Sequence, residues 1–158
     1  MEPKIKHIIF LDVDGVCNSE DWYYRSRVLK ETQDKGDFDF HAIELLNQLE
    51  GCEIVISSSW GNMADSPLKA HGLKLPIIGH IDHTPYYSAN WICRGNCIEK
   101  YIEENLQLNN YEYVIFDDDT DMLLSQVDNF VHVDSKVGLQ QSDIDKARKI
   151  LQLYDNSN

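Results

Sequence analysis

The sequence predicts an α/β fold in which helices cover both faces of a doubly wound parallel sheet, a Rossmann-like arrangement in three layers. Short, continuous apolar runs alternate along the chain with stretches in which apolar residues recur every three or four positions. Continuous runs rich in β-branched residues are typical of strands that are covered on both faces. Strands that alternate with helices indicate parallel pairing, because each helix returns the chain to the start of the next strand.

Five apolar runs are the expected strands. Most of them consist of Ile, Val, Leu and aromatic residues bounded by polar residues, and the third is the shortest. This composition favours strands over buried helix segments, because the runs are too short for helices. The expected strands cover residues 8–11, 54–56, 77–78, 113–116 and 130–133.

Three stretches between these runs have the apolar spacing of amphipathic helices. Apolar residues in 42–49 recur at i, i+3, i+4 and i+7, which places them on one helix face. A second stripe of this kind covers 98–106. Ser142 is the expected N-cap of a last helix, whose apolar face carries Ile144, Ala147 and Leu151.

Length and composition are those of one globular domain, and residues 1–158 are interpreted as a single domain without repeats or linkers. The 158 residues are 42% hydrophobic and 26% charged, which is ordinary for a chain that buries its own core. The formal net charge of -13 predicts long-range repulsion of nucleic acids and anionic membranes. A nucleic acid is therefore expected only as a substrate, and a membrane is not an expected partner.

The sequence also favours a cytoplasmic protein. No apolar run has the length needed to cross a bilayer. The apolar run behind the basic N-terminal residues stops at Asp12, which makes it too short for a signal peptide. Cys17, Cys52, Cys93 and Cys97 have no CxxC pairing, which predicts reduced thiols rather than disulfides or a zinc site.

Polar residues directly follow three of the expected strands. Asp12-Val13-Asp14-Gly15 follows the first strand, Ser57-Ser58-Ser59 follows the second, and the acidic run 117–121 follows the strand at 113–116. Ligands bind beyond the carboxyl ends of the strands in an open α/β sheet. Carboxylates and a hydroxyl would therefore meet at one strongly negative edge, which requires a hard cation, and a phosphate partner would favour Mg²⁺.

Two other interpretations of Asp12 and Asp14 compete with a catalytic one. The first is a solvated turn, which a lone DxDG motif often forms. The second is a calcium loop, which needs an acidic or amide ligand at loop position five and Gly at position six. Those positions hold Val16 and Cys17, which excludes the calcium loop. A buried strand before the motif and a second acidic cluster after another strand favour a catalytic site.

The order of these motifs resembles the haloacid dehalogenase (HAD) superfamily of phosphatases. Residues 8–16, IIFLDVDGV, resemble its first motif, and 54–57, IVIS, resemble its second. Arg94, at the start of a helix, resembles the third motif, and 114–121, VIFDDDTD, resemble the acidic fourth. The four motifs span nearly the whole chain in the family's order. Residues 57–60 and 117–122 also resemble small HAD domains found in phage and in RNA-repair proteins.

The resemblance implies a mechanism through an aspartyl-phosphate. Asp12 would attack phosphorus in line, and Asp14 would protonate the leaving oxygen and then activate water. The Asp12 carboxylate, the backbone carbonyl of Asp14 and Asp118 would hold Mg²⁺. Ser57 would donate a hydrogen bond to a phosphoryl oxygen, and Arg94 would add positive charge.

Several site residues have weaker support from the motifs. Arg94 is also compatible with a surface arginine, because the family more often has Lys at this position. Asp117 and Asp121 are expected to orient waters or the Asp118 carboxylate rather than bind the ion, and Asp119 is compatible with a helix cap. Ser58 is a candidate for substrate binding, and His80 and His83 are interpreted as surface or structural residues.

Little of the chain remains for a cap, so the resemblance implies a minimally capped, open site that suits large or extended substrates. The region 16–37 is the expected flap. Within it, Arg25 and Arg27 follow three aromatic residues, and they would point to one face if the segment 21–27 is extended. They would then hold a phosphate beside a stacked base. Alternatively, the aromatic residues pack onto the core and the arginines are solvated. Tyr86, Tyr87 and Trp91 are candidates for the site entrance.

Together these observations predict a Mg²⁺-dependent phosphomonoester hydrolase that acts on a phosphorylated substrate such as a nucleotide or a polynucleotide end. Two alternatives remain open. A phosphotransferase or mutase would use the same aspartyl-phosphate but would pass the phosphoryl group to a second substrate. A binding module would keep the fold without turnover, but it would not need Asp12, Asp14 and Asp118 together.

Overall fold

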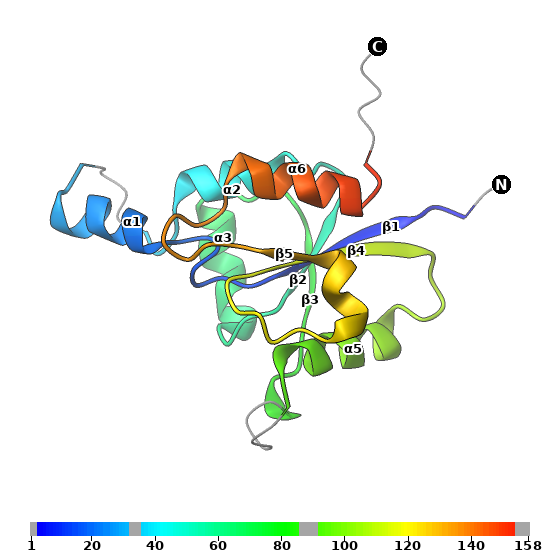
Figure 1. The fold of residues 1–158 in the computed structure, drawn as a ribbon. Coiled ribbons are helices and arrows are strands. Elements are labelled where there is room, and N and C mark those ends of the chain that lie inside the picture. Colours follow the sequence, from blue (N-terminus) through cyan, green and yellow to red (C-terminus); the bar gives the residue numbers. More distant parts are fainter. Residues whose placement is uncertain (1–2, 32–35, 86–91, 154–158) are drawn as a thin grey trace, which may run out of the picture.

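The computed structural model describes residues 3–31, 36–85 and 92–153, which form one five-stranded sheet (Figure 1). All pairings between neighbouring strands are parallel, and the order is β3-β2-β1-β4-β5. The strands are β1 (Lys6–Leu11), β2 (Glu53–Ile56), β3 (Ile77–His80), β4 (Tyr111–Asp117) and β5 (Phe130–His132). Each expected apolar run forms one of these strands, which confirms the doubly wound α/β fold.

Helices cover both faces of the sheet, which gives three layers (Figure 1). Successive side chains of β1 point to opposite faces. Ile9 and Leu11 pack in a cluster with α2, α3 and α6, whereas Ile8 and Phe10 pack in a second cluster with α5. The helices are α1 (Glu20–Tyr23), α2 (Phe40–Asn47), α3 (Asp65–Ala70), α5 (Arg94–Asn105) and α6 (Gln141–Ile150). A π-helix covers Tyr24–Val28, and 3-10 helices cover Gly61–Ala64 and Leu124–Asn129.

Some helix ends differ from those expected. The helix predicted at 42–49 is α2, which ends at Asn47, so that Leu49 is buried in the turn that follows. Ser142 is not the N-cap of α6, so that expectation was wrong. The N-cap is Gln140, whose backbone N–H donates to the Asp143 carboxylate at 2.9 Å. This bond satisfies an N–H at the helix start, and the helix begins two residues earlier than it would with Ser142 as the N-cap.

The expected flap is a helical arm, which we define as Glu20–Val28, rather than an extended segment. Ser19 caps α1 by accepting a hydrogen bond from the backbone N–H of Trp22 at 3.0 Å, and the Trp22 side chain is buried. Figure 1 shows this arm projecting from one end of the sheet. The expectation that Arg25 and Arg27 share one face of an extended strand was therefore wrong, because residues two apart on a helix do not face the same side.

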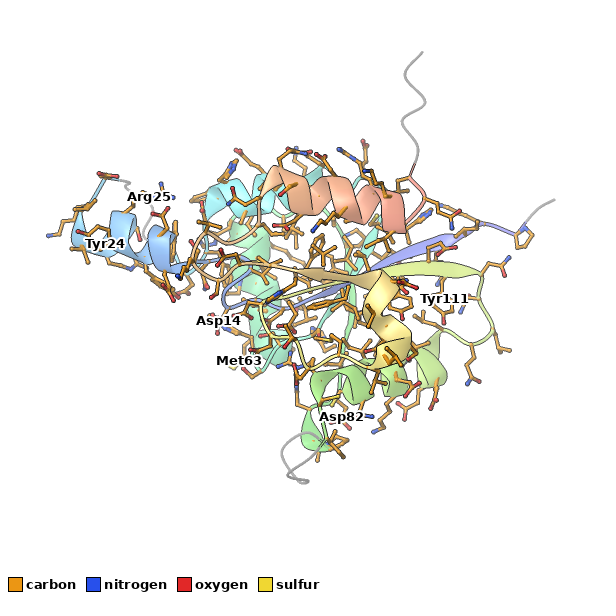
Figure 2. The ribbon with its side chains drawn as sticks, viewed as in Figure 1. Asp14, Tyr24, Arg25, Met63, Asp82 and Tyr111 are labelled. Carbon is orange, nitrogen blue, oxygen red and sulfur yellow. The ribbon has the colours of Figure 1, made fainter. Side chains whose placement is uncertain are left out.

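The carboxyl ends of the strands lie at the end of the sheet from which the arm projects. Figure 2 shows Asp14 at this end and Tyr111, the first residue of β4, at the opposite end. All four cysteines are free thiols. Among the described residues, no helix combines the length and the apolar character that a bilayer span requires. Tyr86, Tyr87 and Trp91, the candidates for the site entrance, lie outside the described residues.

Candidate active site

Three carboxylates converge beyond the ends of β1 and β4. Asp12 directly follows β1, and its backbone N–H donates to the Phe116 carbonyl oxygen at 3.0 Å, which ties the two strand ends together. Asp117 ends β4, and Asp118 follows it. Each of the three aspartates offers a carboxylate oxygen within 4.8 Å of the other two. Asp12 and Asp117 are buried, so their negative charges have little water to stabilise them.

The proximity of these carboxylates changes their protonation. Burial, the charge of Asp117 and a hydrogen bond with Asp118 raise the pKa of Asp12 to about 9, although Arg94 opposes this change. Burial also raises the pKa of Asp117 to about 7, against a hydrogen bond from the Asp119 backbone and the charge of Arg94. The group therefore requires either a proton or a cation at neutral pH.

The arrangement could hold a metal cation, because carboxylate oxygens from two strand ends meet beside a glycine. Gly15 has a φ of 83°, and a Cβ atom at this position would lie 2.4 Å from Asp118 Oδ2. Only glycine lets the loop after β1 approach the Asp118 carboxylate this closely. Asp117 was expected to orient waters or the Asp118 carboxylate, and its own carboxylate lies within the group of three.

Asp14 lies at the rim, and its side chain is not part of the three-carboxylate group. Its carboxylate is exposed and accepts two hydrogen bonds, from Trp60 Nε1 at 3.0 Å and from Asn18 Nδ2 at 3.1 Å. Asn18 also accepts from the Gly15 backbone N–H at 2.9 Å. These contacts hold the Asp14 side chain in one orientation at the solvent edge.

Ser57 and Arg94 lie on the other side of Asp12. Ser57 follows β2, is fully buried and donates its backbone N–H to the Leu11 carbonyl oxygen at 2.8 Å. Its hydroxyl has no hydrogen-bond partner among the described residues, although a buried hydroxyl ordinarily has one. Arg94 Nη1 donates to the Ser57 carbonyl oxygen and lies 3.8 Å from Asp12 Oδ1. The structure thus brings both predicted phosphate-contacting residues beside the predicted nucleophile.

Asp121 contacts the start of α5, where it accepts hydrogen bonds from two backbone N–H groups. Its carboxylate accepts from the Arg94 backbone N–H at 2.9 Å, and its carbonyl accepts from the Gly95 N–H at 3.1 Å. A Cβ atom on Gly95 would lie 2.5 Å from Gln126 Oε1. The absence of a side chain therefore lets the start of α5 pack directly against the segment after β4.

The remaining predicted substrate-binding residues have local partners. The Ser58 hydroxyl accepts from the Trp60 backbone N–H at 3.2 Å and so supports the turn after β2. Arg25 forms an ion pair with Asp21 at 2.8 Å. Arg27 Nη2 donates to the Gly36 carbonyl oxygen at 2.7 Å, and its guanidinium lies 5.4 Å from the centroid of the Trp22 ring.

Two histidines that sequence reasoning did not connect to the site contact its backbone. His83 Nε2 lies 2.6 Å from the Ser58 carbonyl oxygen, and burial together with Arg94 lowers its pKa. His132 Nε2 lies 2.8 Å from the Asp118 carbonyl oxygen. His80 pairs instead with Asp65 at 2.8 Å. No sequence motif marks these contacts, because each joins segments that only the fold brings together.

Comparison with known proteins gives one family match. The model of the family described as the HAD domain in Swiss Army Knife RNA repair proteins matches residues 8–144. A search of curated proteins and a search of solved structures each give no match. The matched range contains β2 to β5, all of β1 except its first two residues, and every residue of the site described above. The chain therefore belongs to the HAD superfamily, in the family of HAD domains of Swiss Army Knife RNA repair proteins.

Proposed function

We propose that this HAD domain is a Mg²⁺-dependent phosphomonoester hydrolase with Asp12 as its nucleophile. The observation that carries the proposal is the position of the Asp12 carboxylate, between two further carboxylates on one side and Arg94 with the buried Ser57 hydroxyl on the other. Membership of the family supports a hydrolase of the HAD type in general. Two acidic oxygens, a cationic donor and a neutral donor around one carboxylate are what transfer of a phosphoryl dianion requires.

Asp12, Asp117 and Asp118 would hold the cation, with the backbone carbonyl of Asp14 as a further ligand. When bound, Mg²⁺ supplies positive charge that offsets the repulsion between a carboxylate and a phosphate dianion. With the cation bound, Asp12 would no longer hold the proton that its raised pKa of about 9 otherwise retains. The Asp12 oxygen is then charged and able to act as a nucleophile.

Asp12 and Asp14 would carry out the two chemical steps in turn. An Asp12 oxygen forms a bond to phosphorus while the bond to the leaving oxygen breaks, and Asp14 donates its proton to that oxygen. A water molecule then attacks the phosphorus of the aspartyl-phosphate and gives a proton to Asp14, while the bond between phosphorus and the Asp12 oxygen breaks. This step releases phosphate and restores the Asp12 carboxylate and the protonated Asp14 with which the cycle began. The Ser57 hydroxyl and the Arg94 guanidinium would bind the phosphoryl oxygens throughout. Asp14 is exposed, and this access for water favours hydrolysis over transfer to a second substrate.

A phosphorylated nucleotide or RNA end is the substrate class that we propose. The matched family comprises HAD domains of RNA repair proteins. The net charge of -13 opposes the binding of a long polyanion but is compatible with a chain end that is held mainly at its terminal phosphate. The four free thiols suit a reducing compartment, and we propose a cytoplasmic location.

A phosphate-release screen tests this function. Purified protein with Mg²⁺ would be incubated with 3′- and 5′-phosphorylated RNA oligonucleotides, nucleoside monophosphates and sugar phosphates. Hydrolysis of at least one class, absent in Asp12→Asn, is the expected result. Transfer of the phosphoryl group to an added alcohol in preference to water would instead identify a phosphotransferase. If neither reaction occurs with any substrate, the remaining interpretation is a binding module without turnover.

Trp60 is expected to be a positioning residue for Asp14. Trp60→Phe removes the indole N–H that holds the Asp14 carboxylate at 3.0 Å but keeps an aromatic ring against Phe38, 5.3 Å away between centroids. A misplaced general acid matters most when the leaving group is poor. We therefore expect kcat for methyl phosphate to fall about tenfold, with a smaller fall for p-nitrophenyl phosphate and little change in KM. Equal losses for the two substrates would show that Trp60 only supports the fold.

A further inference from the structure

A hollow of about 430 Å³ lies directly beside the carboxylate group, between the loop after β1, the loop after β4 and the start of the arm. Asp14 and Asp118 line it on the catalytic side. Ser19, Glu20, Tyr23 and Ser135 are further parts of its wall. Figure 2 shows the arm, which carries the labelled Tyr24, projecting from the end of the sheet at which Asp14 lies. The hollow is thus continuous with the candidate active site but is not used by the steps described above.

The position of Asp14 identifies which part of a substrate the hollow would receive. In the proposed reaction, Asp14 protonates the oxygen that leaves phosphorus. The organic group attached to that oxygen must therefore lie on the Asp14 side of the phosphoryl group. Ser57 and Arg94, which would bind the phosphoryl oxygens, do not line the hollow. The hollow therefore lies on the side of the leaving group.

The chemistry of the lining selects an uncharged leaving group with hydroxyls. None of the described residues that line the hollow is a lysine or arginine, and Glu20 adds a carboxylate to those of Asp14 and Asp118. A second phosphate would be repelled here. The Ser19 and Ser135 hydroxyls and the Glu20 carboxylate instead offer hydrogen bonds to sugar hydroxyls.

Tyr23 adds an aromatic surface at the far side of the hollow. Its side chain is 44% exposed, so part of the ring is available to a ligand. The ring is held from behind by the buried Trp22, at 4.8 Å between centroids and an interplanar angle of 62°. An aromatic ring that is fixed and partly exposed is a suitable platform for a nucleobase. The raised pKa of the Tyr23 phenol, caused first by burial and then by Asp14 and Asp37, agrees with its position facing the acidic rim.

We infer that this hollow binds the terminal nucleoside of the substrate, with the base stacked on Tyr23 and the ribose hydroxyls at Ser19, Glu20 and Ser135. The inference rests on the proposed phosphomonoesterase function and names the part of the substrate that this chain would recognise. It assigns recognition to the base of the arm rather than to Arg25 and Arg27, whose guanidinium groups already have partners within the arm and its neighbouring loop.

Tyr23→Ala, with Tyr24→Ala as the matched control, tests the inference. Tyr24 is the adjacent residue and is 54% exposed, but it does not line the hollow. The substrates are adenosine 3′-monophosphate, adenosine 5′-monophosphate and methyl phosphate, of which the last lacks a nucleoside. Tyr23→Ala should raise KM for the better nucleotide about tenfold, which corresponds to about 1.4 kcal/mol, and leave methyl phosphate unchanged. Tyr23→Phe should retain the wild-type KM because the ring is kept, and Tyr24→Ala should change neither substrate.

Two outcomes would overturn the inference while leaving the proposed function intact. Equal effects of Tyr23→Ala on nucleotide and methyl phosphate would mean that the ring supports the catalytic loop. No effect on either nucleotide would mean that the base lies elsewhere. Failure of the proposed function would look different, because the wild-type protein would hydrolyse none of the three. Binding of the two adenosine monophosphates, measured by calorimetry, would then decide, and a Kd that is the same in wild type and Tyr23→Ala would overturn the inference.

Discussion

Asp12→Asn should abolish phosphate release and, at the same time, stabilise the metal-free protein. An amide cannot form the aspartyl-phosphate, so kcat should fall on the order of 10⁴-fold or more. The amide also carries no charge into the buried group that raises the pKa of Asp12 to about 9. At neutral pH Asp12 must therefore take up a proton when the metal-free protein folds, whereas the amide needs none, so the substitution should raise the free energy of unfolding by about 1–3 kcal/mol in EDTA. Phosphate release and urea unfolding of the same preparation measure the two effects.

Asp119→Asn is the matched control for this substitution. Asp119 belongs to the same acidic run but is exposed, and its backbone N–H, which the substitution keeps, donates to the Asp117 carboxylate at 2.9 Å. The loss of one negative charge near the site should therefore leave both kcat and stability close to wild type. Labelled phosphate from the substrate should be trapped on acid-quenched wild-type and Asp119→Asn protein but not on Asp12→Asn. Trapping on Asp12→Asn would assign the nucleophile to another residue.

The strands and the position of the candidate site could be predicted because a strand that is buried on both faces has a continuous apolar sequence. The four residues Ile8 to Leu11 are completely buried, and a strand covered on both faces has no polar positions to interrupt the apolar run. The polar residue that follows such a run must lie at the carboxyl edge of the sheet. This reasoning identified Asp12 and Ser57 from position alone, whereas Arg94 needed the resemblance to a family.

The arm could not be predicted from periodicity because α1 has only four residues, too few to show a helical repeat. The usable signal was the capping residue Ser19 before an acidic first turn, which is typical of a helix start. The prediction for Arg25 and Arg27 instead assumed that residues 21–27 are extended, which would place both side chains on one face. The burial of Trp22 in the described structure shows that this aromatic residue serves packing.

Contacts between distant segments set the finer details of the site. Asp14 meets Trp60 across 46 positions, and Asp118 meets His132 across the β4–β5 connection. Within the acidic run, similar residues have different surroundings, since Asp117 lies in the carboxylate group and Asp121 binds the start of α5. The sequence of an aspartate run does not show which of its carboxylates points into the site. These assignments depend on loop geometry that the spacing of residues does not fix.

Removal of the metal should abolish turnover, and its effect on stability should depend on pH in a defined direction. The folded protein raises the pKa of Asp12 and Asp117 from their ordinary value of 3.8 to about 9 and about 7. Without a cation the folded state therefore binds protons more tightly than the unfolded chain does. Stability of the metal-free protein should fall as pH rises from about 4 towards about 9, because these protons are progressively lost. A cation bound by the same carboxylates replaces the protons and removes the repulsion.

The increase in melting temperature caused by saturating Mg²⁺ should consequently be small near pH 5 and large near pH 8, since protons and the cation compete for the same oxygens. EDTA should remove phosphate release at every pH, and Mg²⁺ should restore it, whereas Ca²⁺ should bind but support turnover poorly because its coordination is larger and looser. Asp118→Ala should weaken the thermal response and require more Mg²⁺ for activity, while Asp119→Asn should behave like wild type. Turnover that survives EDTA, or an increase in melting temperature that is equal at both pH values, would show that the three carboxylates do not form a metal site needed for the reaction. A response that grows with pH and is reduced by Asp118→Ala would instead tie the raised pKa of Asp12 to the cation site, because one group of oxygens would then bind the proton and the metal in turn.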